Sequence, residues 1–238
     1  MTPYVRMRLA NKARGDFRAE GNTLWLHDAI ASDDDEADWM GGVSPRMFAS
    51  ALKSTQGPVL LRINSPGGSV FGAQAMVAAM REHPHLITAR VDSVAASAAS
   101  VIAAEAAEME MVQGAMVMIH KSWGMSIGNA DEMLAVAALL EKIDGQIAAS
   151  YARRAVGDVA AFLEMMKAET WFTAEEAVSA GLADRVVAEN RQRPSARWDM
   201  SAFDKAPVMA IEEPAAPAFD GRACLARRLA ARLALHTV

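Results

Sequence analysis

The sequence predicts an α/β fold in which repeated right-handed βαβ units build a sheet by parallel pairing. Residues 58–63 (PVLLRI) form a short apolar run typical of a buried strand, and the turn-forming residues 64–68 (NSPGG) end it. Residues 70–82 then carry apolar side chains on one helical face, and residues 86–91 (LITARV) form a second apolar run. A strand, a glycine-rich turn, a helix and a strand in this order make a βαβ unit, which implies parallel strands and a right-handed crossover.

Length, composition and charge set limits on the class of protein. A chain of 238 residues that is 52% hydrophobic predicts one large domain, with or without an appendage, and excludes disorder throughout. The formal net charge of -5 argues against duplex nucleic acid as the main partner. Cys224 is the single cysteine, which excludes an intrachain disulfide and a zinc site of several thiolates. We expect a cytoplasmic protein, because no apolar run is long enough for a membrane span and residues 1–16 lack the apolar middle of a secretory signal.

The chain before the βαβ unit contains fewer regular elements. Residues 1–22 form a mixed polar N-terminal segment, and residues 23–27 (TLWLH) are expected to be a strand. Residues 33–38 (DDDEAD) are expected to be an acidic, solvated loop. Ser44 followed by Pro45 supplies an N-cap and a first helical residue, so a short amphipathic helix is expected to begin there.

The alternation of helices and strands continues to about residue 189. Helices are expected at 95–107, 131–156, 159–168 and 174–180, and strands at 110–112, 115–119 and 182–187. The long helix carries a narrow apolar seam, which consists of Val136, Leu140, Ile143, Ile147 and Tyr151. We expect another subunit to cover this seam, and packing on the helix's own core is the alternative.

Residues 190–238 differ in composition from the domain that precedes them. They are punctuated by proline and lack sustained periodicity, so we expect a flexible tail. A basic amphipathic helix is expected within it, where an apolar stripe lies beside four arginines: Leu225, Ala226, Leu229, Ala230 and Leu233, with Arg222, Arg227, Arg228 and Arg232. A segment that docks a partner, a segment that binds a membrane surface and an extension without function are the alternatives.

Three motifs follow predicted strands, where open α/β sheets place functional groups. Residues 64–68 can point backbone amides at a developing oxyanion, although they match neither common phosphate-binding pattern. Ser97, at a predicted strand-to-helix junction, could be a nucleophile, and His120, at the end of an apolar strand, could accept its proton. Taken singly, each motif also fits an ordinary turn, a packed helical serine or a hydrogen-bonded core histidine. No histidine lies in a metal-binding HxH or HExxH pattern, so no metal is expected.

Taken together, four segments occur in the order found in the Clp-type serine peptidases. They are INSPGGSV (63–70), VAASAASVIA (94–103), VMIHKSW (117–123) and ETWFTAEEAVSAGLAD (169–184). The chain resembles this family over roughly residues 23–187. It is more similar to the phage and prophage branch, the head maturation (prohead) proteases, because residues 38–43 (DWMGGV) resemble the segment that opens the domain in that branch.

The resemblance implies a role for each candidate residue. Ser97 matches the family's nucleophile, His120 its base and Glu169 its acid. The backbone amides of Gly68 and Ala98 match the donors of its oxyanion hole.

The acid is the position at which this sequence departs from the family pattern. The ring-forming members usually have aspartate where this chain has Glu169, although a glutamate can also orient an imidazole. Asp158 and Asp184 are the alternative acids. A serine-lysine mechanism through Lys121 is a further alternative, but Lys121 adjoins His120 and would point to the other side of a continuing strand.

The resemblance also implies an architecture and an assembly. The expected fold is the Clp protease/crotonase-like fold with a long projecting handle helix, and residues 23–189 would form the peptidase domain. Residues 123–129 would bind the substrate backbone, and the handle would interlock stacked rings of identical subunits. No cofactor and no metal are expected.

The expected activity is hydrolysis of peptide bonds by a serine endopeptidase. The resemblance to the phage branch implies capsid or scaffold proteins as substrates during procapsid maturation, in the bacterial host cytoplasm or within the procapsid. One alternative is a Clp-type proteolytic subunit fed by an ATP-dependent unfoldase. Another is a catalytically idle scaffold for capsid assembly. An acyl-CoA enzyme of the crotonase type would share the fold but would have no use for Ser97 and His120.

Overall fold

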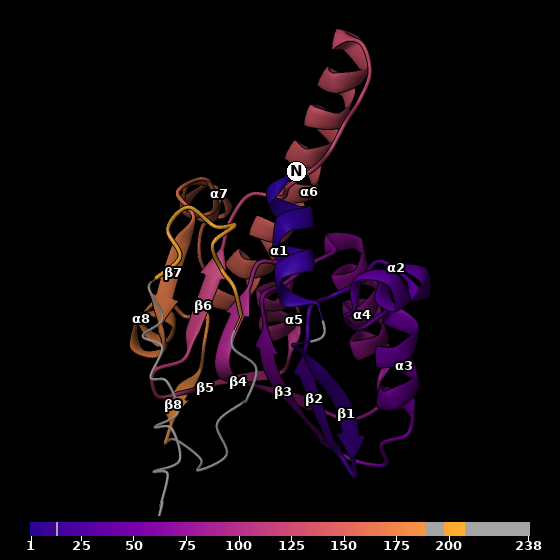
Figure 1. The fold of residues 1–238 in the computed structure, drawn as a ribbon. Helices are drawn as coiled ribbons and strands as arrows, with labels where there is room; N and C mark the ends of the chain where they lie inside the picture. The colour runs from indigo at the N-terminus through magenta and orange to yellow at the C-terminus, as the bar shows by residue number, and fades with distance from the viewer. Residues whose placement is uncertain (13, 189–197, 208–238) are drawn as a thin grey trace, which may run out of the picture. The chain divides into compact units, whose positions relative to one another are not determined.

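The computed structural model describes residues 1–12, 14–188 and 198–207 (Figure 1). Its described helices are α1 (Pro3–Asn11), α2 (Asp34–Met40), α3 (Pro45–Lys53), α4 (Val70–Glu82), α5 (Ala98–Glu105), α6 (Ala130–Ala155), α7 (Val159–Lys167) and α8 (Ala174–Ser179). Its described strands are β1 (Asp16–Glu20), β2 (Thr23–His27), β3 (Val59–Ser65), β4 (Ile87–Ala96), β5 (Glu108–Val112), β6 (Met116–Ile119), β7 (Thr170–Thr173) and β8 (Arg185–Val187). The amphipathic helix expected around residue 229 lies outside the described residues.

The strands form a sheet in the order β1-β2-β3-β4-β5-β8, and the α/β fold class is confirmed. The pairs from β2 to β8 in this order are parallel, whereas β1 runs antiparallel to β2. Strand β4 forks the sheet, because its first half pairs with β5 and its last three residues pair with β6. Strand β7 continues this branch antiparallel to β6. The carboxyl ends of β4 and β6 therefore lie side by side.

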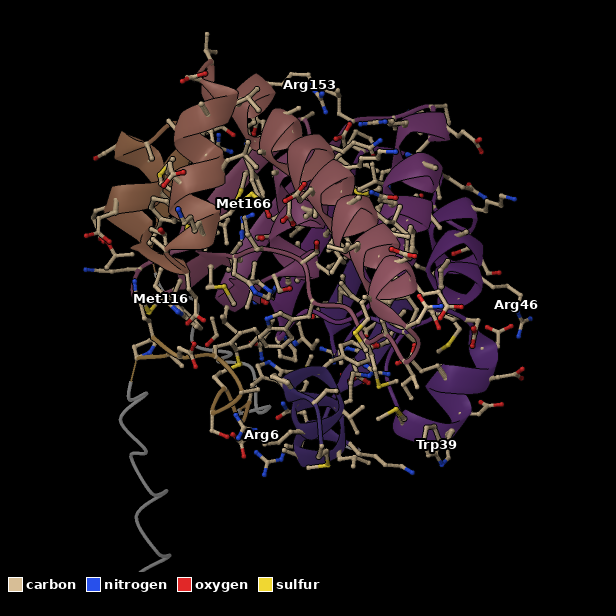
Figure 2. All side chains as sticks on the ribbon, turned by 90° about the horizontal axis from the view of Figure 1, so that it is seen from above. Arg6, Trp39, Arg46, Met116, Arg153 and Met166 are labelled. Carbon is tan, nitrogen blue, oxygen red and sulfur yellow. The ribbon has the colours of Figure 1, made fainter. Side chains whose placement is uncertain are left out.

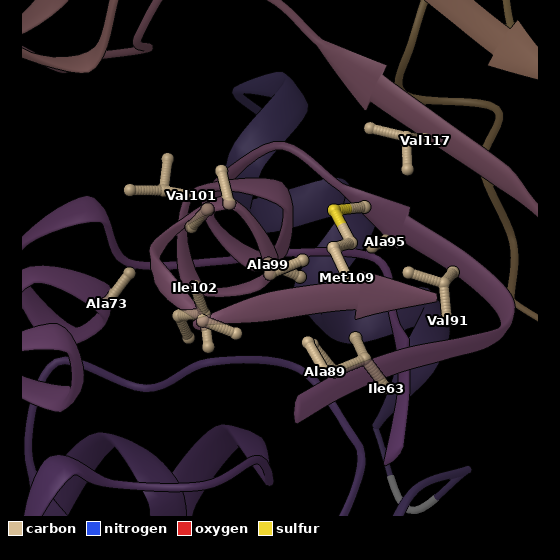
Figure 3. Packing of buried hydrophobic residues seen from close by; sticks show 14 of the residues in the cluster. Ile63, Ala73, Ala89, Val91, Ala95, Ala99, Val101, Ile102, Met109 and Val117 are labelled. Atoms are coloured by element: carbon tan, nitrogen blue, oxygen red, sulfur yellow. The ribbon is translucent and has the colours of Figure 1, made fainter. Parts of the chain in front are cut away.

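Helices α3 to α8 supply the main apolar core together with the strands. Figure 3 shows part of this core, in which Ala99 and Ile102 of α5 belong to the same cluster as Ala89 and Val91 of β4. Small side chains at Ala89 and Ala99 allow a helix to approach the sheet closely. This tight packing fixes the start of α5, which directly follows the end of β4.

A second, smaller core contains residues from both ends of the described chain. Met7 of α1 packs there with Ala96 of β4, Met118 of β6 and the residues Trp198, Met200, Ala202 and Phe203. Arg6 of α1, which Figure 2 labels, donates a hydrogen bond of 2.6 Å to the carbonyl of Ser201. The compact unit reaches from Met1 to Ala206, so it includes residues that we expected in the N-terminal segment and in the flexible tail.

Residues 33–38 are not the acidic loop that the sequence predicts. Asp34, Asp35 and Glu36 form the first turn of α2, and the Asp33 side chain accepts a hydrogen bond from the amide of Glu36 as the N-cap. Acidic side chains at this end of a helix are stabilised by the helix dipole, so the charge run that indicated a solvated loop is also a favourable helix start.

The two halves of α6 lie in different environments. Ile143, Ile147 and Tyr151 are buried in the main core of their own subunit, so the expectation that another subunit covers the whole seam is wrong. Tyr151 packs against Phe162 of α7, with ring centroids 5.9 Å apart. The N-terminal half projects from the body in Figure 1, and its large exposed apolar residues are Met133, Leu134 and Leu139.

Among the helices of the described residues, none is both long and apolar enough to cross a bilayer.

Candidate active site

Ser97 occupies the junction between β4 and α5 in a strained backbone conformation. Its φ of 54° and ψ of -124° lie in a region that residues other than glycine rarely adopt. The Ser97 amide donates to the carbonyl of Met118 on β6 at 2.9 Å, and the Ser97 carbonyl accepts from the amide of Ser100 at 3.0 Å. These hydrogen bonds hold a sharp strand-to-helix turn, and a turn of this kind presents the nucleophile in the α/β-hydrolases.

His120 follows β6 directly and meets Ser97 at the same edge of the sheet. Ala96 of β4 is in register with Met118 of β6, so the residues just beyond both strands are brought together. The Nε2 atom of His120 lies 2.7 Å from the Oγ atom of Ser97. The structure therefore brings together the two residues for which the sequence predicts nucleophile and base.

Burial lowers the pKa of His120 from 6.5 to about 4, against the opposing negative charges of Glu169 and Asp144. Two aromatic rings pack edge-on against the imidazole: Trp123 at 4.7 Å and Phe203 at 5.3 Å between ring centroids. These rings exclude water and disfavour the charged imidazolium. The imidazole is neutral at about pH 7 and can accept a proton from Ser97.

The loop that follows β3 approaches the Ser97 turn so closely that glycine is required. A Cβ atom on Gly67 would lie 2.8 Å from the Cβ of Ser97, and one on Gly68 would lie 2.1 Å from the carbonyl oxygen of Ile30. Among the described residues, the amides of Gly68 and Ala98 donate no hydrogen bond to another group. Both amides are thus available as donors, and Ala98 is the first residue of α5, where the helix dipole favours negative charge.

Glu169 lies close enough to act on His120 electrostatically, but its hydrogen bonds go elsewhere. Its carboxylate accepts from Nε1 of Trp171 at 3.2 Å and from the amides of Asp204 at 3.0 Å and Lys205 at 2.6 Å. Within the described part of the chain, no hydrogen bond joins Glu169 to His120. The structure therefore places the predicted acid in the neighbourhood of the base without direct contact.

The two alternative acids have structural partners. Asp158 is the N-cap of α7 and accepts from the amide of Ala160 at 3.2 Å. Asp184 accepts from the amide of Met109 at 2.6 Å and forms an ion pair with Arg154 at 2.5 Å. These contacts leave Glu169 as the better placed of the three carboxylates.

Sequence reasoning missed a buried carboxylate beside the base. Asp144 of α6 is 3% exposed and accepts from the amide of Ser122 at 2.8 Å and from its hydroxyl at 2.6 Å. Its second oxygen lies 3.7 Å from Nζ of Lys121. Asp144 thus fixes the loop after His120 and engages Lys121, which gives no support to the serine-lysine alternative. A charged residue between Ile143 and Ile147 of the apolar seam was the signal that could have revealed it.

The described part of the site offers a serine hydroxyl, an imidazole and two backbone amides. Among the described residues, no group of three or more His, Cys, Asp or Glu side chains could hold a metal ion. The chemistry that this arrangement can perform is nucleophilic attack by a serine hydroxyl, with a neutral imidazole as the base and two amides beside the developing oxyanion.

Comparisons with known proteins give a consistent result. Residues 33–190, more than half of the chain, match the family described as Clp protease. The chain is 32% identical to an ATP-dependent Clp protease proteolytic subunit of Pleurastrum terricola over 129 residues, which cover 53% of this chain and 66% of that protein. A protein with the same description from Chlorella vulgaris is 28% identical over 67% of this chain and 79% of that protein. Another from Streptococcus gordonii is 31% identical over 62% of this chain and 77% of that protein.

Proposed function

Because the chain belongs to the Clp protease family, whose members are serine peptidases, we propose that it hydrolyses peptide bonds through Ser97 and His120. The observation that supports this proposal most strongly is the 2.7 Å contact between Ser97 Oγ and His120 Nε2. Its support is independent of sequence similarity, because it follows from the fork of β4 and the strained turn at Ser97.

The proposed reaction uses Ser97 as the nucleophile. Its Oγ attacks the scissile carbonyl carbon while its proton passes to Nε2 of His120. The amides of Gly68 and Ala98 donate to the oxyanion of the tetrahedral intermediate. The C–N bond then breaks as His120 returns the proton to the leaving amine, and water hydrolyses the acyl-enzyme by the same steps in reverse order.

Glu169 is proposed as the acid that stabilises the imidazolium formed in each of these steps. The support is electrostatic, since the Glu169 carboxylate already raises the pKa of His120 against the effect of burial. A direct hydrogen bond to the second ring nitrogen would require the carboxylate, which now accepts from three other donors, to move closer to the imidazole.

Of the biological roles that the sequence suggests, the comparisons favour a proteolytic subunit fed by an ATP-dependent unfoldase. All three relatives named above are proteolytic subunits of ATP-dependent Clp proteases, and none of the three is a head maturation protease. These matches favour the unfoldase-fed alternative over the phage setting that the motif resemblance suggests. We accordingly propose assembly into rings, protein substrates and a cytoplasmic location.

Peptide hydrolysis by purified protein tests the proposed activity. We expect Ser97→Ala to lower kcat/KM for an unstructured peptide by about four orders of magnitude, because it removes the attacking oxygen and little volume. Circular dichroism and sedimentation should match those of the parent protein. If Ser97→Ala retains activity within about tenfold of the parent, the peptidase assignment fails. A second assay tests the proposed setting. If Ser97→Ala abolishes peptide hydrolysis but an unfoldase with ATP does not promote degradation of a folded substrate by the parent protein, the proposed chemistry stands and the unfoldase-fed setting fails.

A further inference from the structure

Residues 198–206, which we call the C-terminal strap, lie on the second core beside the active site. The strap is anchored at its start by side-chain hydrogen bonds. Nε1 of Trp198 donates to Oδ1 of Asn64 at 3.0 Å, near the end of β3 and just before the loop that contains Gly67 and Gly68. Asn11 of α1 binds the backbone of Asp199 twice, at 2.7 Å to its amide and at 2.9 Å to its carbonyl. These contacts fix the part of the strap that leads to His120.

Phe203 places an aromatic ring of the strap against the catalytic base. It is 4% exposed, and its ring lies edge-on to His120 at 5.3 Å between centroids. The same ring stacks on Trp123 at 5.0 Å and meets Trp171 edge-on at 6.2 Å. Aromatic pairs of this geometry are favourable beyond the area that they bury. The strap therefore fills the space beside the imidazole and contributes to its exclusion from water.

The next two residues of the strap bind the predicted acid. The amides of Asp204 and Lys205 both donate to the carboxylate of Glu169, at 3.0 and 2.6 Å. With Trp171 Nε1 at 3.2 Å as a third donor, the carboxylate is satisfied by partners other than His120. In a working triad the acid must face the imidazolium that forms when the base takes the serine proton.

On the premise of the proposed peptidase activity, we propose that the C-terminal strap is an autoinhibitory element that acts within its own subunit. It holds Glu169 on the amides of Asp204 and Lys205, away from His120, and it fills the space beside the base with Phe203. Departure of the strap frees the carboxylate for the imidazole and opens this side of the site. The opposite role, in which the strap holds Glu169 in its working position, predicts the opposite sign for each measurement below.

The rate at which a fluorophosphonate labels Ser97 measures this effect without a contribution from product release. Lys205→Pro removes the backbone N–H that donates to Glu169, whereas Lys205→Ala keeps it. Both variants lose the hydrogen bond from Nζ of Lys205 to the carbonyl of Ala168, so the comparison between them isolates the backbone N–H. Phe203→Ala removes the ring against His120. We expect Lys205→Pro and Phe203→Ala to raise the second-order labelling rate about tenfold or more, because the competent fraction rises, and Lys205→Pro to be labelled at least about threefold faster than Lys205→Ala.

Ala206→Pro is a second control, because it makes the same change one residue further along the strap and leaves both donors to Glu169 in place. Equal or lower labelling rates in folded Lys205→Pro and Phe203→Ala overturn the proposal. If no form of the protein is labelled at Ser97, the peptidase assignment itself fails. If the parent protein is labelled at Ser97 but the strap variants are labelled no faster, only the proposal of an inhibitory strap fails.

Hydrogen exchange on the unsubstituted protein gives a test that does not depend on the folding of variants. Reaction at Ser97 joins Oγ to phosphorus as fluoride leaves and the serine proton passes to His120, and the ring attracts the Glu169 carboxylate for as long as it holds this proton beside the phosphonyl oxygen. We expect the amides of Asp204 and Lys205 to exchange faster after labelling than before, because they lose their acceptor. Unchanged or slower exchange at these two amides contradicts an inhibitory strap.

Discussion

Ser97 holds its hydroxyl at the end of β4 by adopting a φ of 54°. A side chain in this region costs free energy, of the order of 1 to 3 kcal/mol, which the hydrogen bonds of the turn and the packing of α5 must offset. Glycine adopts such a conformation without that cost. The strain therefore belongs to the backbone at this position, and the hydroxyl is not needed for the turn to form.

The strain predicts a difference in stability between two inactive variants. Ser97→Gly should be more stable than Ser97→Ala by about 1 kcal/mol in urea unfolding, because only glycine relieves the positive φ. Both variants lack the nucleophile, so activity cannot separate them. Equal unfolding midpoints, or a less stable glycine variant, would show that the turn at Ser97 stores no strain.

The depressed pKa of His120 predicts the pH dependence of both activity and stability. Because burial lowers the pKa of His120 from 6.5 to about 4, the ring stays neutral and competent well below pH 6.5. The acid limb of the Ser97 labelling rate should therefore lie closer to pH 4 than to pH 6.5. Between these two values the unfolded chain binds a proton that the folded chain does not, so the contribution of His120 to stability decreases as the pH falls.

Asp144 supplies the matched variant for this pH profile. Asp144→Asn keeps an acceptor for the Ser122 amide but removes a negative charge that raises the pKa of His120. The acid limb should move to lower pH in this variant. An acid limb at the ordinary histidine value in the parent protein, or an upward shift in Asp144→Asn, would contradict the electrostatic description of the site.

Single residues also show where sequence reasoning reaches its limit. Ser97 and His120 could be identified because each ends a recognisable apolar strand within a specific motif. The partners of Glu169 could not be predicted, because Asp204 and Lys205 bind it through backbone amides, which carry no sequence signal. The strap as a whole lacks helical or strand periodicity and was therefore expected to be part of a flexible tail.

Among the described helices and strands, α6 is the one whose two halves differ most clearly in burial. Its C-terminal half is buried in the main core, and its N-terminal half projects with exposed apolar side chains (Figure 1). The apolar period along the seam is the same in both halves, so periodicity alone could not distinguish packing within the subunit from packing between subunits. Helix α1 and strand β1 had no clear period and were not predicted at all.

The two halves of α6 should respond differently to substitution. Ile147→Ala should destabilise the subunit by about 2 to 5 kcal/mol in urea unfolding, since it leaves a cavity in the core. Leu134→Asp should leave the unfolding of the subunit almost unchanged and yield smaller particles in sedimentation, because an exposed apolar residue on the projecting half is suited to contact another copy. A stable, fully assembled Leu134→Asp protein would remove the proposed role of the projecting half in assembly.

At the scale of the whole molecule, the forked sheet explains how distant parts of the sequence form one site. Strand β4 leads to Ser97 and to the Ala98 amide at the start of α5, β6 leads to His120, and the loop after β3 supplies the Gly68 amide. The βαβ order of these elements was predictable from hydrophobic pattern and turn residues. The second core was not, because it unites α1 with residues 198–206 from the other end of the described chain.

The central claim is that Ser97 is a nucleophile activated by His120, and covalent labelling tests it most directly. Intact-mass analysis after reaction with a fluorophosphonate should show one added phosphonyl group per chain, and peptide mapping should place it on Ser97. His120→Ala should slow labelling by about three orders of magnitude or more with the fold intact, since the serine then lacks its base. Labelling at another residue, or labelling of Ser97 at the parent rate in His120→Ala, would contradict this account of the active site.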